Sequence, residues 1–251
     1  MGDTGENHDE RKRRSAALLL EHREGKEVWG ELSLLAGQQC TKKIANKFLI
    51  CCLLDWQMDS TVAWRNGYRL VESILGDPDD VWKAITSIPE SSWASRHIEY
   101  KLHRYGAGHR RLWSIAWHIC DIYDGDARRI WTDKEPSDVI RRLGAIVAGD
   151  QIPRMIVGAL LDCGQIKGTG DVKADVHVCR VLGRAVNGDP ADSETAGKLA
   201  QELNPMDPWQ LDWPLWNLGK SHCHARTQDC ARCYLAPHCS AALKRDLCIS
   251  S

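Results

Sequence analysis

The chain has 251 residues, of which 43% are hydrophobic and 27% charged, and its formal net charge is −1 at pH 7. These values are ordinary for a globular protein and allow one large domain or two modest lobes. The longest apolar run, Phe48 to Leu54, is too short to span a bilayer, and the first residues, MGDTGENHDERKRR, lack the apolar segment of a secretory signal. We expect those first residues to form a disordered or frayed tail.

Apolar residues at helical spacing dominate the rest of the chain. Several segments begin at residues that commonly start helices, and several end at glycine. The predicted helices are 46–75 with a break near 55–60, one from Asp77 and Pro78 through Ile85, about 108–123 ending at Asp124 and Gly125, one from Pro136 to Gly144 or Gly149, about 150–163, one capped by Asp175, one from Ser193, and one from Asp207 and Pro208 that kinks or breaks at Pro214. Residues 164–174, rich in glycine and charge, are predicted to form a loop. Because no segment alternates as a strand would, the predicted fold class is all-α.

The chain contains eleven cysteines in two groups. Seven lie mostly among apolar residues, which indicates buried free thiols and a reducing compartment such as the cytoplasm. Thiolates at high density can close around an iron–sulfur cluster or a zinc ion. Structural zinc sites usually combine two short pairs of ligands, and only one short pair is present here. The second group, with the pattern C-x6-C-x2-C-x5-C, is Cys223, Cys230, Cys233 and Cys239.

Five stretches, in this order, resemble the endonuclease III family of helix-hairpin-helix DNA glycosylases. They are Phe48–Gln57, Tyr105–Arg111 with the helix after it, Pro136–Gln151, Ala174–Val181 (ADVHVCRV, close to the family's V-D-T-H-x-x-R-V), and Trp216–Cys223 with the cysteine loop. The resemblance covers roughly residues 40–240 and implies that the four cysteines of the loop hold a [4Fe-4S] cluster.

The resemblance also implies the architecture. Two helical lobes flank a DNA-binding cleft: a six-helix barrel with the helix-hairpin-helix, and an iron–sulfur cluster lobe built from both ends of the chain. Residues 1–37 then form an N-terminal tail and a helix packing on the cluster lobe, 38–165 form the barrel, and 166–251 form the catalytic-aspartate helix and the cluster lobe.

Asp175 matches the family's catalytic aspartate. Breaking an N-glycosidic bond builds positive charge on the sugar, so a fixed carboxylate beneath C1′ stabilises the transition state or deprotonates the attacking water. A second interpretation is that Asp175 caps its helix, a common role for aspartate, and the two roles can coexist. We expect His177 to be a structural hydrogen-bonding residue.

Bifunctional members of the family carry a hairpin lysine that forms a Schiff base with C1′ and leads to strand cleavage. A gap-free count places Gln151 at that position, whereas an alignment with a different gap places Met155 there. Neither side chain can form a Schiff base. Lys167 and Lys173, in the loop that follows, are the alternative amines. The resemblance therefore implies a monofunctional glycosylase that uses water and leaves an intact abasic site.

The hairpin itself is Val147, Ala148 and Gly149, with Val147 in place of the family's first glycine. Its backbone N–H groups should approach a DNA phosphate closely, which glycine permits best. We therefore expect a weaker or shifted phosphate contact, assisted by Arg154.

Gln57 matches the glutamine that enters the base stack when a nucleotide is flipped out; the alternative is a solvated loop residue. Asp55 and Trp56 are base-pocket candidates, the first for reading N–H donors and the second for stacking. Ordinary core packing is the alternative for Trp56, in a chain with eleven tryptophans and one phenylalanine. Cys51 occupies the place of the glutamate used by adenine-excising relatives, which disfavours adenine opposite oxidised guanine as the substrate.

Basic residues gather between positions 96 and 111, the best candidate for binding phosphates. Solvated helix faces are the alternative role for many of them. Because the net charge is −1, we expect weak DNA binding with a steep salt dependence. The patch contains Arg96, Lys101, Arg104, Arg110 and Arg111, and further candidates are Arg128, Arg129, Arg141, Arg142 and Lys220.

These features predict a monomeric DNA base-excision glycosylase with a [4Fe-4S] cluster, acting on double-stranded DNA that contains a damaged or mismatched base. The alternative is a non-catalytic DNA-binding or lesion-sensing relative that retains the fold and the cluster, which the altered hairpin and the low net charge favour. An electron carrier is a third possibility that no residue pattern requires.

Overall fold

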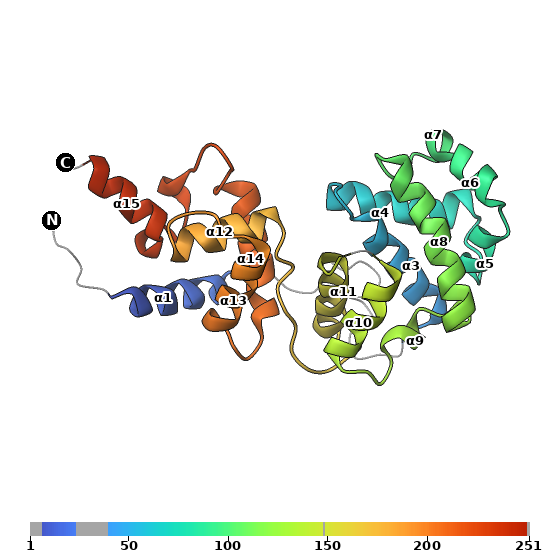
Figure 1. The fold of residues 1–251 in the computed structure, drawn as a ribbon, viewed down its shortest axis with the longest axis horizontal. Coiled ribbons are helices and arrows are strands. Elements are labelled where there is room, and N and C mark those ends of the chain that lie inside the picture. Colours follow the sequence, from blue (N-terminus) through green and yellow to red (C-terminus); the bar gives the residue numbers. More distant parts are fainter. Residues whose placement is uncertain (1–6, 24–39, 148, 250–251) are drawn as a thin grey trace. The chain divides into compact units, whose positions relative to one another are not determined.

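The computed structural model describes residues 7–23, 40–147 and 149–249 (Figure 1). These residues form helices joined by loops, and the only β-type pairing among them is an isolated bridge between Cys223 and Gln228. The all-α prediction is therefore confirmed. None of the described helices has the length and apolar character needed to cross a membrane.

The chain divides into two compact units, each with its own hydrophobic core. The central unit is Lys26–Gly168, and the discontinuous unit joins Met1–Gly25 to Thr169–Ser251. Segments that are far apart in the sequence therefore share one core in the discontinuous unit.

The central unit is built around helix α3 (Lys42–Leu54), in which nine of 13 residues are buried. A helix that is apolar on most sides must be surrounded by other elements, and α4, α5, α8, α9 and α11 all contact α3. Trp82, Trp93 and Trp131 are fully buried in this core. The elements are α3 (Lys42–Leu54), α4 (Ser60–Tyr68), η2 (Arg69–Ile74), α5 (Val81–Thr86), α6 (Glu90–Ser95), α7 (His97–Tyr100), α8 (Gly106–Tyr123), α9 (Arg128–Trp131), α10 (Pro136–Ile146) and α11 (Gln151–Asp162).

Helix boundaries near the start of this unit follow the capping residues. The predicted break after α3 is confirmed, and α4 begins after Asp59, whose carboxylate accepts hydrogen bonds from two backbone N–H groups. The helix predicted to start at Asp77 and Pro78 begins instead at Val81. Asp80 caps it by accepting from the Lys83 N–H (3.2 Å), whereas Asp77 has a φ of 54° and lies in a turn.

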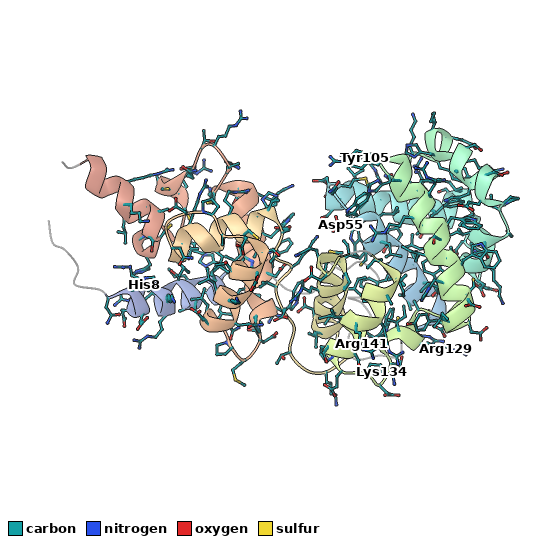
Figure 2. The ribbon with its side chains drawn as sticks, viewed as in Figure 1. His8, Asp55, Tyr105, Arg129, Lys134 and Arg141 are labelled. Atoms are coloured by element: carbon teal, nitrogen blue, oxygen red, sulfur yellow. The ribbon has the colours of Figure 1, made fainter. Side chains whose placement is uncertain are left out.

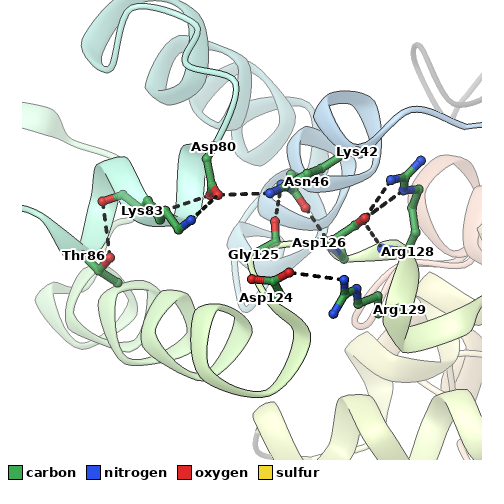
Figure 3. A network of polar contacts seen from close by, with 11 residues as sticks. Lys42, Asn46, Asp80, Lys83, Thr86, Asp124, Gly125, Asp126, Arg128 and Arg129 are labelled. Carbon is green, nitrogen blue, oxygen red and sulfur yellow. Dashed lines mark hydrogen bonds and ion pairs between the residues drawn. The ribbon is translucent and has the colours of Figure 1, made fainter.

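The end of α8 is fixed by a buried amide. Asp124 and Gly125 adopt left-handed conformations and turn the chain, as the sequence predicts. Asn46, buried on α3, donates to the Gly125 carbonyl (2.9 Å) and accepts from the Ala127 N–H (2.9 Å), so both polar ends of its side chain are satisfied (Figure 3).

The discontinuous unit is organised around α12, which α1, α13, α14 and α15 contact. Its apolar face carries Val178, Val181 and Leu182, all buried. The elements of this unit are α1 (His8–Glu21), α12 (Val176–Val186), α13 (Ser193–Leu203), η3 (Pro208–Leu211), α14 (Asp212–Ser221), η4 (Cys230–Arg232), η5 (Ala236–His238) and α15 (Ser240–Ile249).

Two expectations for this unit are wrong. Residues 8–14, predicted to belong to a frayed tail, form the first half of α1, because Asn7 caps the helix and Leu19 is fully buried on the unit's core. The predicted kink at Pro214 is absent. The 3-10 turn η3 ends at Leu211 and α14 starts at Asp212, so Pro214 falls in the first turn, where its missing N–H has no helical partner to lose.

Candidate functional site

Asp175 is the N-cap of α12 and is half-buried. Its Oδ1 accepts hydrogen bonds from the backbone N–H groups of His177 (2.8 Å) and Val178 (3.1 Å). Its Oδ2 has no hydrogen-bond partner among the described residues. The capping role is confirmed, and one carboxylate oxygen is held in place by the helix N-terminus while the other remains available.

His177 lies one residue inside the same helix and packs against α14. Burial lowers the pKa of His177, an effect that the nearby Asp175 carboxylate opposes. Its Nδ1 lies 3.0 Å from the guanidinium of Arg180, which can only donate, so Nδ1 accepts. Gly219 on α14 makes this packing possible, because a Cβ there would lie 2.7 Å from the His177 Cβ.

Two arginines on α12 hold the cysteine loop, and neither is among the predicted site residues. Arg180 donates to the carbonyls of Gly219 (2.9 Å) and Cys223 (2.6 Å). Arg184, one helical turn later, donates to the Cys223 Sγ (3.4 Å) and the His224 carbonyl (2.8 Å). The two arginines are four residues apart and therefore lie on the same face of α12 as neighbours, which is the signal that could have identified them. The helix that presents Asp175 is thereby fastened to the first cysteine of the motif.

The four cysteines of the motif line a single cavity in the discontinuous unit. Burial raises the pKa of Cys233 to about 11 and raises that of Cys239, and the neighbouring cysteines add to both effects. No group of three or more histidine, cysteine, aspartate or glutamate side chains in the described part of the chain is gathered closely enough to hold one metal ion. A tetrahedral zinc site would bring four sulfurs to about 2.3 Å from one point, whereas a four-iron cluster takes each sulfur on a different iron. Four cysteine sulfurs around one cavity are the kind of donor set that such a cluster uses.

The hairpin lies between α10 and α11 in the central unit. Val147 is 3% exposed, so its side chain belongs to the core rather than to a phosphate-binding surface. Ala148 lies outside the described residues. Gly149 has a φ of 85° with open space around it, which suits a close backbone approach. Arg154, expected to assist phosphate binding, forms an ion pair with Asp150 (3.0 Å).

The two positions considered for the missing lysine differ in their surroundings. Met155 is 5% exposed and packs in the central core. Gln151 is the first residue of α11, and its buried Oε1 has no hydrogen-bond partner among the residues that the structure describes. Gln151 therefore lies beside the hairpin, whereas Met155 faces away from it into the core.

Gln57 lies at the turn between α3 and α4. It is exposed and has a φ of 50°, a left-handed conformation that is uncommon for residues other than glycine. Asp55 is 6% exposed and accepts from the Ser60 hydroxyl (3.0 Å). Trp56 is half-buried and stacks on His103, with ring centroids 5.3 Å apart.

Five of the predicted basic residues of the central unit fall into two groups. Arg104 lies over the ring of Tyr105 (4.7 Å) and Arg111 over that of Trp56 (5.5 Å), next to the Gln57 turn. Three further arginines bind aspartates instead. Figure 2 shows two of them, Arg129 and Arg141, at another edge of the central unit from Asp55 and Tyr105, and Figure 3 shows the contacts of Arg128 and Arg129. These pairs are Arg128–Asp126 (2.7 Å), Arg129–Asp124 (3.2 Å) and Arg141–Asp138 (2.8 Å).

Lys220 belongs to a small aromatic face of the discontinuous unit. Its ammonium lies 5.3 Å from the ring centroid of Trp216, which in turn meets His177 edge-on at 6.3 Å. Trp213 stacks on Trp216 at 5.3 Å. Aromatic rings beside a cation are suited to nucleic-acid surfaces, since the rings can stack and the cation can bind phosphate.

Three solved structures resemble this chain along nearly its whole length. A trapped endonuclease III–DNA covalent intermediate (an estranged-adenine complex) has 16% identity and a TM-score of 0.60, covering 93% of this chain and 98% of that one. A non-covalent endonuclease III–DNA complex has 16% identity and a TM-score of 0.59, covering 93% and 94%. A thermostable thymine-DNA glycosylase has 13% identity and a TM-score of 0.62, covering 94% and 98%.

No protein-family model matches the chain, and no curated protein matches it in sequence. At 13–16% identity the likeness to the solved structures concerns the fold. The chain has the all-α helix-hairpin-helix fold of endonuclease III, as its motifs predict.

Proposed function

We propose that this protein is a monofunctional DNA glycosylase that removes a damaged or mismatched base from double-stranded DNA and acts as a monomer. The observation that carries this proposal is the state of Asp175. Its Oδ1 is fixed by two backbone N–H groups, and its Oδ2 has no partner among the described residues. A carboxylate fixed in this way suits the stabilisation of positive charge that develops on a sugar.

The proposed reaction is hydrolysis of the N-glycosidic bond. Asp175 stabilises the cationic sugar and accepts a proton from the attacking water, whose oxygen bonds to C1′. The electron pair of the broken C1′–N bond leaves with the base, which takes up a proton. The products are the free base and an abasic site in an unbroken strand.

The absence of strand cleavage follows from Gln151. An amide nitrogen is not nucleophilic and cannot form the Schiff base on which a lyase step depends. Gln151 stands beside Gly149 at the hairpin, where a lysine would be needed, and Met155 is buried in the core. Water is then the nucleophile.

DNA contacts are proposed in both units. In the central unit, the backbone around Gly149 at the start of α11 binds a phosphate, and Gln57 takes the place of the extruded nucleotide. In the discontinuous unit, Lys220 beside Trp216 binds the strand. Similarity of the fold to two endonuclease III–DNA complexes supports this assignment.

Cys223, Cys230, Cys233 and Cys239 are proposed to hold a [4Fe-4S] cluster. When bound, the cluster would supply a structural cross-link for the loop between Cys223 and Cys239. Protein purified without oxygen should contain about four irons and four sulfides per chain and absorb visible light. Stoichiometric zinc in a colourless protein would contradict this assignment.

Base excision can be tested on labelled duplexes that each contain one lesion or mismatch. Strand breaks are measured with and without treatment with hot alkali. We expect breaks only after alkali, and at least a hundredfold loss of rate (about 10² or more) in Asp175→Asn. Asp192→Asn is the matched control, because Asp192 is also a helix N-cap in the same unit and accepts from the Thr195 N–H (2.7 Å). Asparagine keeps both caps, so a loss confined to Asp175→Asn reports chemistry rather than folding.

A non-catalytic lesion reader is the second candidate. The buried Val147 and the aspartate-paired arginines favour it, because both reduce the surface available for phosphates. Binding that distinguishes lesion from normal duplex, with no alkali-sensitive product from any substrate, would support the reader and exclude the enzyme.

A further inference from the structure

His103 connects two exposed turns of the central unit. Its side chain is 3% exposed. Its Nε2 lies 2.7 Å from the carbonyl oxygen of Trp56, the residue just before Gln57. Its Nδ1 lies 3.1 Å from the backbone N of Tyr105 at the start of α8. The Gln57 turn and the Tyr105 turn, 48 positions apart in the sequence, are thus joined by one ring.

The hydrogen bonds identify the form of this imidazole. A carbonyl oxygen can only accept, so Nε2 carries a hydrogen and donates to Trp56. The backbone N–H of Tyr105 donates, so Nδ1 presents its lone pair; the Tyr105 carbonyl lies farther away, at 3.3 Å. The neutral Nε2–H tautomer satisfies both contacts at once. A phenyl ring of the same shape would satisfy neither.

The surroundings hold the ring in this position. Trp56 stacks on it with an interplanar angle of 13°. Gly108, in the first turn of α8, leaves the space it needs, because a Cβ there would lie 2.4 Å from the His103 Nδ1. Asn66 donates to the carbonyls of Lys101 (3.3 Å) and Leu102 (3.0 Å), which fixes the backbone just before His103.

We propose that His103 is a positioning residue that sets the geometry of Gln57 and Tyr105 as one DNA-contacting tip. The inference rests on the proposed function and extends it. The left-handed conformation of Gln57 is sparsely populated by itself, so its surroundings must maintain it. The Trp56 carbonyl that His103 holds belongs to the peptide group that precedes Gln57. Tyr105, 43% exposed with Arg104 over its ring, is suited to contact a nucleotide beside Gln57.

Structural tests of the His103 contacts need no substrate. Nitrogen NMR of the histidine rings should show His103 with a protonated Nε2 and an unprotonated Nδ1. Hydrogen exchange at the Tyr105 amide should accelerate in His103→Phe, which removes the acceptor, and in Gly108→Ala, whose added Cβ would displace the ring. His118→Phe and Gly144→Ala are matched controls, since a Cβ at Gly144 meets open space. A protonated Nδ1, or unchanged exchange in both variants, would overturn the proposal.

Base extrusion gives the functional test. A fluorescent base next to the lesion reports unstacking, and single-turnover excision at saturating enzyme reports the rate. We expect His103→Phe and Gly108→Ala to lower extrusion and rate about 10- to 100-fold, the scale on which misplaced groups act, while affinity for undamaged duplex changes little. Because His103 acts through the two turns, its effect should largely disappear in a Gln57→Ala, Tyr105→Ala background.

The outcomes separate the two proposals. His103→Phe could lower the excision rate by the same factor in the Gln57→Ala, Tyr105→Ala protein as in the wild type. That result would show a general packing role for His103 and overturn the positioning role. Wild-type protein that excises no base would overturn the proposed function, and the NMR and exchange measurements would still decide whether His103 holds the turns. Gly108→Ala that behaves as Gly144→Ala in every measurement would contradict the geometry on which the inference depends.

Discussion

Gln151 begins α11 beside the hairpin, where, under the proposed mechanism, a lysine would turn hydrolysis into strand cleavage. We expect Gln151→Lys to place an amine within reach of C1′ and to give the protein a Schiff-base intermediate. Borohydride should trap a protein–DNA adduct with this variant and none with the wild type.

Met155→Lys is the contrasting variant, because Met155 is 5% exposed and a charge there would unfold the central unit rather than add a lyase step. A wild-type adduct that disappears in Lys167→Ala or Lys173→Ala would show that one of these loop lysines acts as the amine. That result would contradict a monofunctional mechanism.

Two histidines make stability depend on pH. Burial lowers the pKa of His109 and of His177 below the ordinary 6.5. The unfolded chain keeps the ordinary value and binds more protons, so the free energy of unfolding falls as pH falls through about 6.5. We expect the urea midpoint to drop between about pH 7 and pH 5. The drop should be smaller in His109→Gln than in the wild type, and a His118→Gln control should keep it in full.

At the scale of elements, prediction succeeds where a local signal dominates. Pro136 opens α10 and Asp175 caps α12, because each needs only its own backbone and the next few N–H groups. Asp77 and Pro78 carry the same kind of signal, yet the helix starts at Val81, because the left-handed Asp77 puts the chain in a turn. Residues 8–14 are predicted to be a tail although they belong to α1, because the stability of this helix comes from packing against a distant part of the sequence.

Two glycines in the discontinuous unit make a matched test of packing. A Cβ at Gly183, on α12, would lie 2.2 Å from the backbone N of Ala191, which donates to the Cys179 carbonyl. A Cβ at Gly197, on α13, meets nothing within 4 Å. We expect Gly183→Ala to cost about 1–3 kcal/mol of unfolding free energy through overpacking. Gly197→Ala should add about 0.5–1 kcal/mol by stiffening the unfolded chain. Equal effects in urea unfolding would contradict the close approach at Gly183.

At the scale of the whole molecule, the balance of charge bears on the proposed DNA binding. Since Arg128, Arg129 and Arg141 bind aspartates, fewer cations are available for phosphates than the sequence suggests. We expect Lys220→Gln to reduce the slope of log affinity against log salt by about 1. Arg129→Gln should leave the slope unchanged. An equal reduction in both variants would show that the ion pair with Asp124 opens on DNA.

The sequence predicts the fold class, the hairpin segment and the cysteine motif, because each is carried by residues close together in the chain. The side chains around them come from far away. His103 contacts a turn 47 positions earlier, and Arg184 contacts a cysteine 39 positions later. Helical periodicity cannot bring such residues together, since only tertiary packing decides which helix faces meet. These neighbours of the site therefore emerge from the structure alone.

The discontinuous unit imposes an order on biosynthesis. α1 is made before the central unit, yet the elements that it packs against, α12, α13, α14, η3 and η5, are made after that unit. The central unit can fold while the nascent chain is still growing, whereas α1 must wait with its apolar face uncovered. Slow translation after residue 168 would lengthen that exposure, and a chaperone that binds short amphipathic helices would find its target in α1.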